Sequence, residues 1–129
     1  TTKQIAAACK KIARHGELIR ADNAAKQVIV DLRTDYGINI TGVTKGKNSR
    51  QAGYDWLRDL DQIVIDPITC PNAAREFAAY EYVRDKSGTL VERYPDGDDH
   101  SIDAVAYGNR EHIYRSRRTS NVSGKGARR

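Results

Sequence analysis

The sequence predicts a single α/β domain in which short strands alternate with helices and part of the sheet is parallel. Short apolar runs at residues 18–21, 38–43 and 63–65 are typical of strands, and helical patterns lie between them. Parallel neighbours need a crossover, and the connections of roughly 15–20 residues supply one. We therefore expect these strands side by side in one sheet that helices cover.

In chain order, a helix is expected over residues 2–15, where apolar side chains recur at helical spacing before Gly16 ends the pattern. A second helix is predicted over residues 24–35, with Asn23 as its cap. A third is predicted to begin with Ser49 as its cap. These helices would cover the sheet formed by the first strands.

The second half of the chain carries a different pattern. A helix is predicted over residues 73–81, followed by two strand-like segments that flank the turn at residues 85–88, as in a hairpin. After Pro95, one last helix is expected to run to about Arg115. The remaining residues form a basic tail.

Composition and charge describe a soluble domain with a basic end. The 129 residues are 39% hydrophobic and 30% charged, with no apolar run near the ~20 residues that cross a bilayer, so we expect no membrane partner. Residues 115–129 hold six basic and no acidic side chains, whereas the rest holds 16 basic and 17 acidic ones. Such a tail is typical of a disordered terminus, which either binds phosphate backbone or only aids solubility. Cys9 and Cys70 match no zinc or disulfide pattern, which favours a cytosolic protein.

The segment from Asp98 to Tyr107 is the strongest candidate for chemistry. His100 and Asp103 are three residues apart and so share one helix face, which Tyr107 continues a turn later. Such a face can present metal-ligating groups to a substrate. The alternative is an ordinary helix start, in which Asp98 or Asp99 caps the helix.

A second candidate acid, Asp22, ends the first predicted strand directly before a helix. Ligand sites in open α/β sheets lie at the end of a strand. The alternative is that Asp22 only caps the following helix, beside Asn23. Carboxylate oxygens suit Mg²⁺ or Mn²⁺. We therefore expect the carboxylates of Asp22 and Asp103 to approach within roughly 4–8 Å, close enough to share metal.

The loop from Lys45 to Arg50 is a candidate phosphate-binding segment. Gly46 permits close backbone approach, Lys45 and Lys47 supply charge, and the helix start at Ser49 offers backbone N–H groups. The spacing is not that of a Walker A loop. A solvated basic turn is the alternative.

Taken together, these segments resemble the carboxy-terminal nuclease domain of tailed-bacteriophage terminase large subunits, over about residues 19–112. Four blocks carry the resemblance: ADNAAK at residues 21–26, KGKNSR at 45–50 with Gly53 and Leu57, REFAAY at 75–80 with the hairpin behind it, and DHSIDA at 99–104 with Tyr107.

The resemblance implies an RNase H-like fold, with a central mixed sheet flanked by helices, and a Mg²⁺- or Mn²⁺-dependent endonuclease that cuts concatemeric double-stranded DNA. It implies that Asp22 and Asp103 are catalytic metal ligands and that His100 assists them. The loop residues Lys45, Lys47, Ser49 and Arg50 are implied to contact DNA. Through the full-length protein, it implies the terminase small subunit and the portal or procapsid as partners, in the host cell cytoplasm.

The resemblance implies a first catalytic acid on an opening strand, and we expect that strand to be missing here because a helix is already predicted from residue 2. We therefore expect residues 1–114 to form a partial nuclease domain, followed by the tail at 115–129, and expect little cleavage by this chain alone. Two alternatives stay open. One is a non-catalytic module that binds DNA or portal, and the other is a different RNase H-like nuclease such as a resolvase or transposase.

Overall fold

The computed structural model describes residues 1–123 and divides into two compact units, one of residues 1–47 and one that begins at Asn48. The first unit contains a small parallel sheet, and the second is helical with a hairpin. None of the helices described here combines the length and apolar character needed to cross a membrane.

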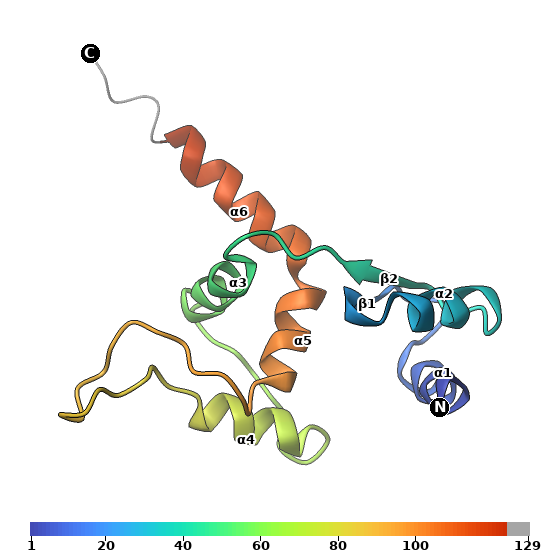
Figure 1. The fold of residues 1–129 in the computed structure, drawn as a ribbon, viewed down its shortest axis with the longest axis horizontal. Helices are drawn as coiled ribbons and strands as arrows, with labels where there is room; N and C mark the ends of the chain where they lie inside the picture. Colours follow the sequence, from blue (N-terminus) through green and yellow to red (C-terminus); the bar gives the residue numbers. More distant parts are fainter. Residues whose placement is uncertain (124–129) are drawn as a thin grey trace. The chain divides into compact units, whose positions relative to one another are not determined.

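The first unit contains α1 (Thr2–Ile12), β1 (Ile19–Asp22), a short 3₁₀ helix (Asn23–Ala25), α2 (Lys26–Thr34) and β2 (Ile40–Val43) (Figure 1). The two strands pair in parallel, with Ile19 opposite Ile40 and Asp22 opposite Val43. This pairing confirms the parallel arrangement predicted for the first two strands.

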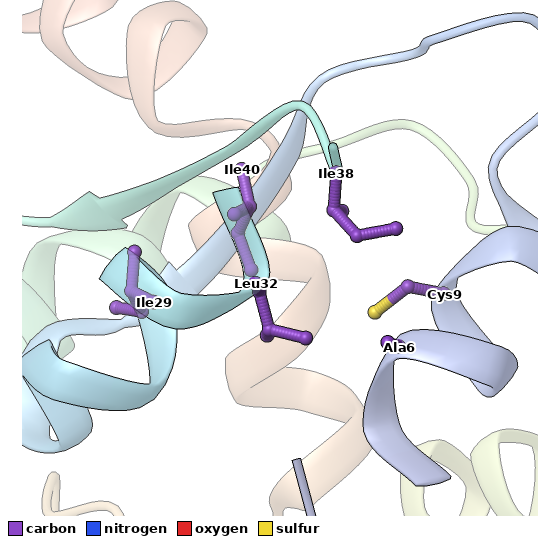
Figure 2. Close-up of a cluster of buried hydrophobic side chains, with 6 residues drawn as sticks. All are labelled: Ala6, Cys9, Ile29, Leu32, Ile38 and Ile40. Carbon is purple, nitrogen blue, oxygen red and sulfur yellow. The ribbon is translucent and has the colours of Figure 1, made fainter. Parts of the chain in front are cut away.

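The core of the first unit is formed by side chains from α1 and α2, from β2 and from the residues just before β2. Figure 2 shows the buried members, which are Ala6, Cys9, Ile29, Leu32, Ile38 and Ile40. Ala6 and Cys9 are three residues apart on α1, as are Ile29 and Leu32 on α2, so each helix turns one apolar face inward. Ile19 and Ala21 of β1 pack against this core.

The prediction of a third strand at residues 63–65 is wrong for the part of the chain that the structure describes. The described sheet has two strands, and the segment is irregular. Val64 is 83% exposed and Ile63 42% exposed. An apolar run becomes a buried strand only where a neighbouring strand accepts its hydrogen bonds, and the residues described here supply no such neighbour.

The second unit contains α3 (Ser49–Arg58), α4 (Pro71–Ala79), α5 (His100–Gly108) and α6 (Arg110–Ser123) (Figure 1). The core is formed by buried side chains of α3, α5 and α6, namely Ala52, Tyr54, Leu57, Ile102, Ala106 and Ile113. A Cβ atom on Gly53 would lie 3.2 Å from that of Ala106. The glycine therefore lets α3 approach α5 closely.

Between α4 and α5 the chain forms the predicted hairpin around residues 85–88. The Val91 N–H donates to the Val83 carbonyl at 2.8 Å, and the Asp85 N–H donates to Thr89 at 2.9 Å. The last helix differs from the prediction, because it breaks between Gly108 and Arg110. Its second part, α6, continues through residues assigned to the tail as far as Ser123, and the rest of that tail lies outside the described residues.

Candidate functional site

The candidate site in the second unit is organised around the first turn of α5. Asp99 holds the cap position, but its side chain makes no capping hydrogen bond. Its carboxylate is instead 2.8 Å from the Arg50 guanidinium of α3. Glu76 of α4 supplies the missing acceptor, since its carboxylate accepts the Ser101 N–H at 2.6 Å. Two neighbouring helices thus hold the start of α5.

Asp103 lies one turn further along α5 and is half-buried. The Tyr54 hydroxyl of α3 donates to its Oδ1 at 2.7 Å, and Tyr54 is only 3% exposed. Burial, and then the hydrogen bond to Asp103, raises the pKa of Tyr54 far above its ordinary value. The hydroxyl therefore keeps its proton and remains a donor to this carboxylate.

His100 is the first residue of α5 and is exposed. Its place three residues before Asp103 on one helix is as the sequence predicted. Within the described residues, no hydrogen bond joins its imidazole to that carboxylate. His100 is therefore accessible to a substrate but is not fixed by the acid beside it.

Asp22, at the end of β1, lies in the first unit. Its Oδ1 accepts the Ala24 N–H at 3.0 Å, so it caps the 3₁₀ helix. Its Oδ2 lies 2.8 Å from Nζ of Lys45, just beyond β2, and the Asp22 side chain is 42% exposed. Parallel strands end at the same edge, and this brings the acid and the lysine together. The capping role predicted as an alternative is therefore real, and it leaves the carboxylate accessible.

Most of the predicted phosphate-binding loop faces solvent. Lys45 and Lys47 are exposed, and Ser49 is the half-buried first residue of α3. The prediction that Ser49 caps this helix is wrong, because Asn48 holds the cap position. Asn48 has the left-handed backbone that asparagine tolerates.

Arg50 belongs to the fold of the second unit. One nitrogen of its guanidinium, Nη2, is 2.9 Å from the Tyr80 hydroxyl, 2.6 Å from the Pro95 carbonyl and 2.8 Å from Asp99. The sequence could not distinguish this inward arginine from the solvent-facing lysines of the same loop. Glu76 and Asp99 were also missed as site residues, because burial of a charged side chain leaves no local pattern.

The chemistry of the available donors suits a hard divalent cation, because carboxylate oxygens are the ligands that Mg²⁺ and Mn²⁺ take up. Within residues 1–123, no three side chains of His, Cys, Asp or Glu converge to form a complete site. The carboxylates of Asp22 and of Asp103 are each of the right chemical type, but neither belongs to a complete metal site within these residues.

Comparison with known proteins adds to this geometry. The chain matches the family described as terminase RNAseH like domain over residues 1–108. It is 46% identical over 90 residues to the terminase large subunit of Bacillus phage SPP1. The aligned residues make up 69% of this chain and 21% of that protein.

The structure is also similar to the crystal structure of the large terminase nuclease domain from bacteriophage SPP1 with bound Mn. The TM-score is 0.77 at 39% identity, over 87% of this chain and 64% of that chain. The chain thus spans less than two thirds of the solved domain. Because the family match covers most of its length, this chain belongs to the RNase H-like nuclease domain of terminase large subunits.

Proposed function

We propose that the chain forms part of a Mg²⁺- or Mn²⁺-dependent endonuclease that cuts concatemeric double-stranded DNA during packaging. The likeness to a terminase nuclease domain with bound Mn, at a TM-score of 0.77, is the observation that carries this proposal. Asp22 and Asp103 would hold the metal. When bound, the ion would supply an activated water and stabilise the leaving oxygen.

The chain's own side chains would place the DNA around this metal. His100 is exposed beside Asp103 and would orient or move a proton at the attacking water. Lys47 and the backbone N–H groups at Ser49 would bind the phosphate backbone, together with Lys45. Arg50 was predicted to join them, but we assign it to the fold because its guanidinium is bound to Asp99.

The whole protein's partners are part of the same proposal, because the chain spans only 21% of the matched large subunit. We propose that the complete protein works in the host cytoplasm with the terminase small subunit and with the portal or procapsid. The matched family favours these partners over those of a resolvase or transposase.

Plasmid nicking by protein expressed from the complete reading frame, with Mg²⁺ and Mn²⁺ varied, tests the proposal. We expect Asp22→Asn and Asp103→Asn to abolish cutting, because each removes a charged metal ligand. Loss of His100 in His100→Ala should slow cutting by about 10²–10⁴-fold, the usual contribution of a proton-transferring group.

Asp59→Asn is the matched control, because this side chain is 73% exposed and lies outside the site. It should cut as the wild type does, and circular dichroism should show that all variants keep their fold. Wild-type cutting by both Asp22→Asn and Asp103→Asn would contradict the assignment. A protein that binds DNA but is inert with every metal would instead be a non-catalytic binding module.

A further inference from the structure

We propose that Tyr54 is a positioning residue, which holds one oxygen of the Asp103 carboxylate so that the other would be available to bind a metal ion. The inference rests on the proposed function. The Tyr54 hydroxyl donates to Oδ1 of Asp103 at 2.7 Å. Within the described residues, Oδ2 receives no hydrogen bond and is left to act as the ligand.

The tyrosine ring is held from several sides. It meets the rings of Tyr80 and Tyr94 edge-on, at centroid distances of 5.5 and 5.0 Å. The Arg50 guanidinium lies over it, 4.7 Å from the centroid. Because the ring is also buried, its hydroxyl has little freedom to leave the carboxylate.

The other partner of this hydrogen bond is held equally well. The first turn of α5 is fixed by Arg50 through Asp99 and by Glu76 through the Ser101 N–H. The Asp103 backbone therefore has a set position, and the remaining freedom is the rotation of its side chain. A hydrogen bond to one oxygen removes that rotation and presents the other oxygen in one direction.

A purely structural explanation makes a different prediction. Buried tyrosine hydroxyls usually find an acceptor, and Asp103 would then serve only to satisfy Tyr54. Loss of the hydroxyl would in that case affect stability but leave metal affinity unchanged. Groups that orient a metal ligand from behind are instead typically worth 10–100-fold in metal affinity.

Tyr54→Phe, which keeps the ring and removes only the hydroxyl, separates these explanations. In protein expressed from the complete reading frame, we expect it to weaken Mn²⁺ binding by about 10–100-fold, measured by calorimetry and by electron paramagnetic resonance. Raised Mn²⁺ should restore most of its cleavage. The control is Tyr94→Phe, which removes a hydroxyl of the same aromatic cluster that donates to Asp55 at 2.9 Å. It should bind Mn²⁺ like the wild type.

A measurement on the unmodified protein covers the case in which Tyr54→Phe does not fold. With the tyrosine ζ carbons labelled by ¹³C, Mn²⁺ should broaden the Tyr54 signal before that of Tyr94. Wild-type Mn²⁺ affinity in Tyr54→Phe, or equal broadening of the two signals, would overturn the positioning role. Should Asp103→Asn keep full Mn²⁺ affinity and cleavage, the metal site itself would be misplaced and both proposals would fall.

Discussion

At the scale of single residues, the structure separates charged side chains that the sequence places together. Lys47 and Arg50 are three positions apart and both positively charged, yet Lys47 is exposed whereas the Arg50 guanidinium is bound to the buried Asp99 carboxylate. The pattern of apolar and polar residues along the chain predicts which apolar side chains are buried. The direction of a long charged side chain depends instead on partners far away in sequence. For Arg50 that partner is Asp99, 49 positions away.

Removal of Arg50 tests this assignment. We expect Arg50→Ala to lower the free energy of unfolding by about 1–3 kcal/mol, because it leaves the Asp99 carboxylate without its main donor. Arg58→Ala on the same helix loses a more exposed side chain and should stay within about 0.5 kcal/mol of the wild type. Urea unfolding measures both. If Arg50→Ala were as stable as the wild type but bound DNA more weakly, Arg50 would belong to the DNA surface.

At the scale of elements, the predictions that succeeded depend on local information. The helices that begin at Thr2, Ser49 and Pro71 follow from apolar periodicity, and the hairpin follows from its turn. The strand predicted at residues 63–65 failed because pairing depends on a neighbour outside the segment. The helix break between Gly108 and Arg110 was missed, since a single glycine only weakly disfavours helix.

The hairpin turn itself carries a prediction about pH. The Asp85 carboxylate accepts from the Ser87 hydroxyl at 2.6 Å and from the Thr89 N–H at 3.0 Å. These hydrogen bonds, that from Ser87 first, lower the pKa of Asp85 below its ordinary value of 3.8. The stabilisation is thus fully present above pH 3.8 and is lost as the pH falls through the lower, folded-state value.

Amide exchange should report this loss. Protection of the Ser87 and Thr89 amides should drop on acidification below the ordinary aspartate pKa, and Asp85→Ala should lower it at neutral pH. Asp66→Ala is a control, because that acid accepts hydrogen bonds in a different loop. Unchanged protection of the Thr89 amide in Asp85→Ala would show that the backbone hydrogen bonds between the two hairpin segments are sufficient to hold the turn.

At the scale of the whole molecule, the two candidate ligands belong to different units. The sequence predicted Asp22 at the end of a strand and Asp103 near the start of a helix. Four sequence blocks in the same order predicted the family, which the comparisons confirm. Spacing along the chain carries no information on whether Asp22 and Asp103 share an ion. The convergence of Asp22 and Asp103 on one ion therefore remains a prediction.

Paramagnetic broadening by Mn²⁺ tests that convergence most directly. In ¹⁵N-labelled protein expressed from the complete reading frame, substoichiometric Mn²⁺ should broaden the amides of Asn23 and Ala104 together, since each follows a proposed ligand. Mg²⁺ should compete with both effects at the same concentration. Broadening confined to one of the two amides, or at clearly different Mn²⁺ concentrations, would contradict a metal site shared by Asp22 and Asp103.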